Sequence, residues 1–143
     1  MTLCLLSPHS SFIELPSTII ILMKNVLIID DHADMRRTTA DFLALLVDNI
    51  QIDEAEDGDH ALLLIEKKKY DLIISDQNMP TLSGTELASI LSKSGKFKSD
   101  KFLIITGVEI EKVPLNEGLK VEVFDKAQLI EKVIPRINEL LTE

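Results

Sequence analysis

Apolar residues follow two alternating patterns from residue 24 onward. Short continuous runs of Val, Leu, Ile and Phe, bounded by acidic or turn-forming residues, are typical of strands covered on both faces. Such runs occupy residues 26–29, 72–74 and 102–105, and two further strands are expected over residues 50–55 and 119–124. Because helical patterns separate them, the strands are expected to pair in parallel through right-handed crossovers. The sequence therefore predicts an α/β fold, a doubly wound five-stranded parallel sheet of flavodoxin-like order 2-1-3-4-5 with helices on both faces.

Between these runs, apolar residues recur at helical spacing. The first helix is expected to be capped by Asp34. Its inner stripe is expected to be Phe42, Leu43, Leu45 and Leu46. Further helices are predicted from Gly58 and from Ser83, and a last one after the fifth strand. Between the fourth and fifth strands Pro114 interrupts the pattern, so a full helix is not expected there.

Composition narrows the class of protein. The 143 residues suit one domain, and 45% hydrophobic residues allow a substantial core. A net charge of −9 argues against binding of nucleic acid, and the run 67–69 of lysines is expected to be a solvated helix end. The single Cys4 leaves no disulfide framework and suits a reducing, cytoplasmic location. The histidines lack ligand spacing and are expected to be ordinary surface residues: His9, His32 and His60.

Residues 1–23 differ from the rest of the chain. They contain no Lys or Arg, and Pro8 and Pro16 interrupt a stretch too short to span a membrane. We expect a poorly ordered or dispensable extension over residues 1–23, followed by one domain over residues 24–143, with no membrane attachment.

Polar residues follow several of the predicted strands. Asp30 and Asp31 end the first strand, Asp76 follows the third, Thr106 the fourth, and Lys126 comes just after the fifth. Each alone has a structural explanation such as a helix cap or a surface pair, but caps do not require this combination. Parallel strands end at one edge of a sheet, so these side chains should converge. Crowded carboxylates need a cation, and Mg²⁺ suits a site with few carboxylates.

The motifs VLIIDD, LIISDQNMP, LSG, LIITG and VFDKAQL occur in this order between Lys24 and Leu141. This set resembles that of the bacterial two-component response-regulator receiver domain, of the CheY-like superfamily. The separations are similar too, with 45 residues from Asp31 to Asp76 and 30 from Asp76 to Thr106.

The resemblance implies a role for each matching residue. Asp76 would accept a phosphoryl group from the phosphohistidine of a sensor histidine kinase or of a histidine phosphotransfer protein. Asp31 would bind Mg²⁺ directly, Asp30 through water, and Asp76 together with the backbone carbonyl of Asn78 would complete the metal site. Lys126 would pair with Asp76 or with the phosphoryl group.

The remaining positions concern the switch that follows phosphorylation. Thr106 would turn its hydroxyl toward the phosphoryl oxygen. The family usually has Pro after the lysine, whereas this chain has Ala127, for which a trans peptide bond is expected. The family's Tyr or Phe three residues before the lysine is Val123 here, and Phe124 is expected on the opposite face of the strand. We therefore hypothesise intact phosphorylation with an atypical switch.

The sequence leaves three functional classes to compare. The first is a stand-alone receiver that signals through protein–protein contacts and is not an enzyme beyond its own phosphorylation and slow dephosphorylation. The second is a receiver-like interaction module that is not phosphorylated. The third is an aspartyl-phosphate hydrolase such as a haloacid dehalogenase. That family has a second Asp two residues after the nucleophilic Asp, followed by Thr, and DDHADM does not supply this pattern.

Overall fold

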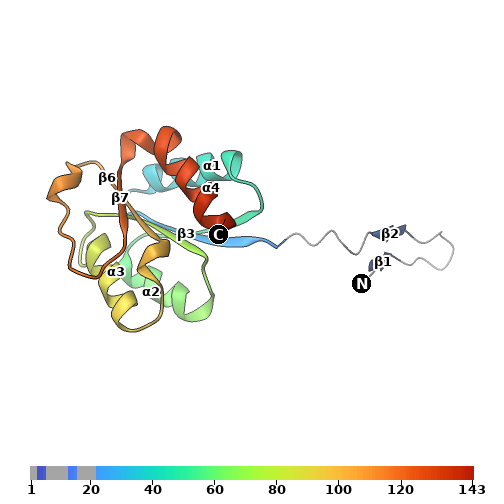
Figure 1. The fold of residues 1–143 in the computed structure, drawn as a ribbon, viewed down its shortest axis with the longest axis horizontal. Helices are drawn as coiled ribbons and strands as arrows, with labels where there is room; N and C mark the ends of the chain where they lie inside the picture. The colour runs from blue at the N-terminus through green and yellow to red at the C-terminus, as the bar shows by residue number, and fades with distance from the viewer. Residues whose placement is uncertain (1–2, 6–12, 16–21) are drawn as a thin grey trace.

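The computed structural model describes residues 3–5, 13–15 and 22–143, and most of these form one parallel sheet with helices on both faces (Figure 1). The strands of this sheet are β3 (Lys24–Ile29), β4 (Ile50–Ala55), β5 (Leu72–Asp76), β6 (Phe102–Thr106) and β7 (Glu122–Asp125). Their hydrogen-bonded order is β4-β3-β5-β6-β7, and every pair is parallel. The predicted order 2-1-3-4-5 is confirmed. Only the last strand differs clearly, because β7 begins at Glu122 rather than at residue 119.

The sheet is covered by α1 (Ala33–Leu46) and α4 (Ile134–Thr142) on one face and by α2 (Gly58–Lys67) and α3 (Gly84–Lys93) on the other (Figure 1). Successive side chains of a strand point to opposite faces, so each apolar run supplies two cores. In β3, Val26 and Ile28 pack toward α1 and α4, whereas Leu27 and Ile29 pack toward α2 and α3. These continuous apolar runs are therefore buried on both sides, as predicted.

Two helices begin at residues that cap them. The Asp57 side chain accepts a hydrogen bond from the His60 N–H at 2.7 Å, at the start of α2. At the start of α3, the Ser83 hydroxyl accepts from the Glu86 N–H at 3.2 Å and donates to the Glu86 carboxylate at 3.0 Å. These caps fix where each helix leaves the edge of the sheet.

The first helix corrects two predictions. Its N-cap position is His32, whose side chain makes no capping hydrogen bond, and Asp34 lies inside the first turn. Leu43 is buried as predicted, but the Leu45 side chain is 75% exposed and Leu46 is exposed too. Because each residue advances about 100° around a helix, Leu45 points roughly away from the face that holds Leu43. The buried residues of this helix are Thr39, Ala40 and Leu43.

The connection between β6 and β7 contains only one 3₁₀ turn, Ile110–Lys112. Pro114 follows closely after that turn, in agreement with the predicted absence of a full helix. After β7, a 3₁₀ turn (Lys126–Gln128) and a π-helical turn (Leu129–Val133) lead into α4. The helix predicted after the fifth strand is therefore regular only from Ile134 onward.

The N-terminal segment contains a separate pair of strands, β1 (Leu3–Leu5) and β2 (Ile13–Leu15), which are antiparallel. The rest of the predicted extension up to residue 21 lies outside the described residues. Within the described ranges, every helix is too short or too polar to cross a membrane.

Candidate functional site

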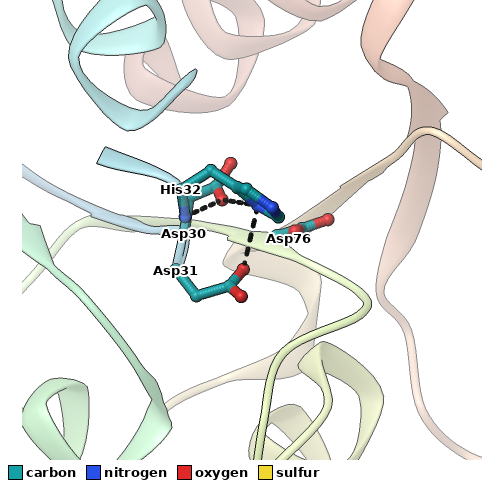
Figure 2. Close-up of side chains that lie close together, drawn as sticks. All are labelled: Asp30, Asp31, His32 and Asp76. Atoms are coloured by element: carbon teal, nitrogen blue, oxygen red, sulfur yellow. Dashed lines mark hydrogen bonds and ion pairs between the residues drawn. The ribbon is translucent and has the colours of Figure 1, made fainter. Parts of the chain in front are cut away.

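Four side chains with ligand atoms meet where β3 and β5 end. Asp30 follows the last residue of β3, Asp31 and His32 come next, and Asp76 is the last residue of β5. One ligand atom from each residue lies within 4.8 Å of those of the other three (Figure 2). The structure thus brings together the three aspartates predicted from the sequence, at the carboxyl edge of the sheet.

Lys126 reaches the same place from the end of β7. Its Nζ lies 3.3 Å from Asp30 Oδ2 and 3.3 Å from Asp76 Oδ1. Both acids are almost fully buried, with 2% of Asp30 and 4% of Asp76 exposed. Buried carboxylates are costly unless a positive charge compensates them. One ammonium group, held by two ion pairs, provides part of that compensation.

The electrostatics of Asp76 show that this compensation is incomplete. Burial raises the pKa of the Asp76 carboxyl above its ordinary value; Lys126 acts in the opposite direction, and the negative charge of Asp30 adds to the rise. The Gln77 N–H also stabilises the ionised form by donating to Asp76 Oδ1 at 2.8 Å. An additional cation at this edge would favour the ionised carboxylate that a nucleophile requires.

Asp31 supplies evidence that the site suits such a cation. Its Oδ1 atom is buried and has no hydrogen-bond partner in the described part of the chain. A buried acceptor without a partner is destabilising, and hard divalent cations bind carboxylate oxygens. Asp30, by contrast, already accepts hydrogen bonds from the His32 N–H at 2.9 Å and from Lys126 at 3.3 Å. This set of carboxylates, with one buried oxygen that accepts no hydrogen bond in the described residues, therefore fits Mg²⁺.

The segment after Asp76 is held by a buried glutamine that was not among the predicted site residues. The Gln77 side chain donates to Thr85 Oγ1 and accepts from the Thr85 N–H, both at 3.0 Å. Its backbone carbonyl accepts from the Gly84 N–H at 3.0 Å. A Cβ at Gly84 would lie 2.5 Å from the Asp76 carbonyl oxygen, so only glycine fits there. This packing fixes the entry to α3 and the position of Asn78, an exposed residue two places after Asp76.

Thr106 ends the strand that neighbours Asp76 on the side away from Asp30 and Asp31. It is the last residue of β6, the strand next to β5, and it is fully buried. Its Oγ1 accepts a hydrogen bond from the Val108 N–H at 3.2 Å. Because a hydroxyl can accept and donate at once, its proton remains available to a group placed at the edge of the sheet.

His32 belongs to the site, although the sequence did not single it out. It is exposed at the surface as expected, but its Nδ1 lies 3.2 Å from Asp31 Oδ1 and 3.4 Å from Asp30 Oδ1. The spacing among histidines gives no sign of this position, because the neighbours of His32 in space are carboxylates. Its place directly after an acid pair was the available signal.

The predicted departures around β7 agree with the structure. Val123 packs against the core on the α2 and α3 side, whereas Phe124 packs on the α1 and α4 side. The two side chains thus lie on opposite faces of the sheet. The peptide bond before Ala127 is trans, and the Ala127 N–H donates to Asp125 Oδ1 at 2.9 Å.

The acidic pocket and the lysine lie at the carboxyl edge of a doubly wound sheet, which is where this class of α/β proteins binds its ligands. The comparison with protein families agrees. The model of the response regulator receiver domain matches residues 26–138, and the chain belongs to this family of two-component signalling. The resemblance identified in the sequence is confirmed. Members of this family accept phosphoryl groups, and they are signalling modules rather than classical enzymes.

Individual relatives support the assignment. The chain is 34% identical over 122 residues to the chemotaxis protein CheY-3 of Vibrio cholerae, covering 79% of this chain and 92% of that protein. The response regulator TrrA of Thermotoga maritima, solved in complex with Mg²⁺-BeF, has a TM-score of 0.71 and 28% identity, covering 82% of this chain and 99% of its own. A structure of the histidine kinase ThkA in complex with TrrA also matches, with a TM-score of 0.69 and 26% identity. The match covers 83% of this chain and 99% of the chain in that structure.

Proposed function

We propose that Asp76 accepts a phosphoryl group from a phosphohistidine in a reaction that depends on Mg²⁺. The observation that carries this proposal is the position of the Asp76 carboxylate. It is buried at the end of a strand, lies 3.3 Å from Lys126, and shares a 4.8 Å cluster with the ligand atoms of Asp30 and Asp31. A nucleophile placed between an ammonium group and a cation-binding acid pair suits phosphoryl transfer, which depends mainly on positioning and on positive charge.

In the proposed reaction, a carboxylate oxygen of Asp76 attacks the phosphorus atom. A P–O bond forms as the P–N bond of the phosphohistidine breaks, and the imidazole nitrogen keeps the electron pair and takes up a proton. Lys126, already at ion-pair distance from Oδ1, remains beside the transferred group and balances its charge. The Thr106 hydroxyl donates to a phosphoryl oxygen while it still accepts from the Val108 N–H.

Three aspartates and one carbonyl are proposed to hold the Mg²⁺. Asp31 is suited to direct binding because its buried Oδ1 accepts no hydrogen bond in the described residues, although the His32 Nδ1 lies 3.2 Å away. Asp30 is suited to binding through water because Lys126 and the His32 N–H already engage its oxygens. Asp76 and the backbone carbonyl of Asn78 complete the set. When bound, the ion supplies positive charge to the phosphoryl oxygens.

The proposed partners are a sensor histidine kinase or a histidine phosphotransfer protein, and a downstream protein target. The similarity to TrrA, which forms a complex with the histidine kinase ThkA, supports a kinase partner. We place this exchange in the cytoplasm, in accord with the single cysteine. Residues 24–143 are proposed as the functional unit, since the family match begins at residue 26, with residues 1–23 dispensable. A chain that starts at Met23 should then be phosphorylated at the full rate.

The experiment that tests this proposal uses acetyl phosphate and intact-mass measurement, with and without Mg²⁺. Wild type should gain one phosphoryl group only with the metal. Asp76→Asn should gain none, whereas the control Asp48→Asn, at an exposed acid away from the site, should behave as wild type. No addition in wild type would instead support an interaction module that is not phosphorylated. Sustained hydrolysis of phosphate esters would support a hydrolase.

A further inference from the structure

The Nδ1 atom of the exposed His32 imidazole is one of the ligand atoms that form the acidic cluster. Figure 2 shows the ring directed toward the carboxylates of Asp31 and Asp76. Its Nδ1 is 3.2 Å from Asp31 Oδ1 and 3.4 Å from Asp30 Oδ1, and it belongs to the group of ligand atoms that lie within 4.8 Å of one another. Nitrogen and oxygen ligands at about 2.1 Å from one metal ion lie about 3 Å apart when adjacent. The 3.2 Å between His32 Nδ1 and Asp31 Oδ1, the atom proposed to bind the ion directly, is close to this value.

Neither core packing nor helix capping explains this position of the ring, whose polar contacts within the described part of the chain are with the carboxylates alone. The His32 side chain is 68% exposed, so it contributes little to the core. It occupies the N-cap position of α1 but makes no capping hydrogen bond through its side chain. The bond from this residue to Asp30 comes from the backbone N–H, which any residue except proline would provide. The side chain can therefore be replaced without disturbing the packing around the acids.

An imidazole changes the preference of a carboxylate site. Oxygen ligands alone suit Mg²⁺, whereas an added imidazole nitrogen favours the later first-row ions, with affinity rising from Mn²⁺ toward Co²⁺ and Ni²⁺. We propose that His32 Nδ1 is a further ligand of the cation held by the three aspartates. The site then binds Co²⁺, Ni²⁺ or Zn²⁺ more tightly, relative to Mg²⁺, than the acids alone would. This inference rests on the metal site of the proposed function.

The test measures dissociation constants of Co²⁺ and Mg²⁺ by competition with a metal-sensitive dye, without any phosphodonor. His32→Asn should weaken Co²⁺ binding by about tenfold while changing Mg²⁺ binding by less than about twofold. His32→Ala should give the same loss, which excludes an effect of the new amide. The chain has three histidines, so a variant with His9→Asn and His60→Asn serves as the matched control and should bind both ions as wild type does.

A spectroscopic signature separates a ligand from a neighbour. Proton resonances of an imidazole bound to paramagnetic Co²⁺ shift far from their usual range; they should be present in wild type and in the control, and absent in His32→Asn. Unchanged Co²⁺ affinity in that variant, or tighter binding of both ions, would overturn the inference. If His32→Asn leaves Co²⁺ affinity unchanged but Asp31→Asn abolishes binding of Co²⁺ and Mg²⁺, the metal site of the proposed function stands. If wild type binds neither ion, both proposals fail.

Discussion

The ammonium group of Lys126 lies 3.3 Å from the carboxylate of Asp76, although 50 residues separate them in the chain. The contact spans β6, because Asp76 ends β5 and Lys126 follows β7 on the far side of that strand. The same Nζ is 3.3 Å from Asp30 Oδ2 at the end of β3. The Lys126 side chain therefore joins the ends of β3 and β5, which carry the acids. Its removal should lower the free energy of unfolding as well as the rate of phosphorylation.

Lys126→Met should destabilise the metal-free protein at neutral pH. It leaves two buried carboxylates without their cation, and we expect a loss of about 2 kcal/mol in the free energy of unfolding. Added Mg²⁺ should restore part of this loss, because it would bind the same acids. Urea unfolding with and without the metal measures both effects. Lys132→Met, at an exposed lysine of the π-helical turn, is the control and should change stability by less than about 0.5 kcal/mol.

Asp76→Asn should stabilise the protein at neutral pH in the absence of metal. Burial raises the pKa of the Asp76 carboxyl above its ordinary value of 3.8. Between pH 3.8 and the raised pKa, the native state keeps a proton that the unfolded chain has released. The wild-type free energy of unfolding therefore falls as the pH rises through this range. The variant lacks this dependence, and the two proteins should converge in stability near the ordinary value. Urea unfolding across the pH range measures the difference. A gap that stays constant with pH would contradict the raised pKa.

Gly84→Ala should damage both the fold and the site. Its Cβ would lie 2.5 Å from the Asp76 carbonyl oxygen, which belongs to the backbone and cannot move without displacing the acid. We expect a loss of about 1–3 kcal/mol in the free energy of unfolding and slower phosphorylation by acetyl phosphate. Gly107→Ala is the matched control for stability, because a Cβ there meets no atom within 4 Å. Equal stability of the two variants would show that the close approach at Gly84 has little effect.

The centre of the sheet could be predicted because β3, β5 and β6 each contain a continuous apolar run that is buried on both faces. The same periodicity was less informative at the ends of elements. The stripe predicted for α1 included Leu45, which the helix turns away from Leu43 and toward solvent. The predicted start of β7 was residue 119 instead of Glu122, since apolar residues in the preceding loop also pack on the core. Local pattern does not distinguish those contacts from a strand.

The candidate site was predictable where topology alone determines proximity. The acids, Thr106 and Lys126 lie at strand ends, so parallel pairing was enough to bring them to one edge. His32 and Gln77 were not found, because their contacts depend on how each side chain points after the strand has ended. His32 meets carboxylates rather than other histidines, and Gln77 bonds to Thr85 eight residues later. Such contacts come from loop geometry, for which the sequence carries no periodic signal.

The conformational change that follows phosphorylation should reach the surface of this domain without the aromatic side chain that the family commonly has three residues before the lysine. The position that is commonly aromatic in the family is Val123, which packs on the α2 and α3 side, and Phe124 packs on the opposite face. A valine has no ring to move inward when Thr106 turns. Amide spectra recorded before and after phosphorylation should therefore show large shifts at Thr106, Val108 and Lys126 but small ones at Val123.

A pair of variants tests this atypical switch directly. Val123→Tyr should extend the shifts along β7, because it supplies a ring on the face where the family has one, whereas Phe124→Leu should leave the pattern unchanged. Both variants should still accept the phosphoryl group, since neither residue belongs to the acidic pocket. If wild type already gives the same shifts across residues 107–126 as relatives with an aromatic residue, the coupling does not need the ring. In that case the short connection after β6, with its single 3₁₀ turn, must carry the change to the surface by itself.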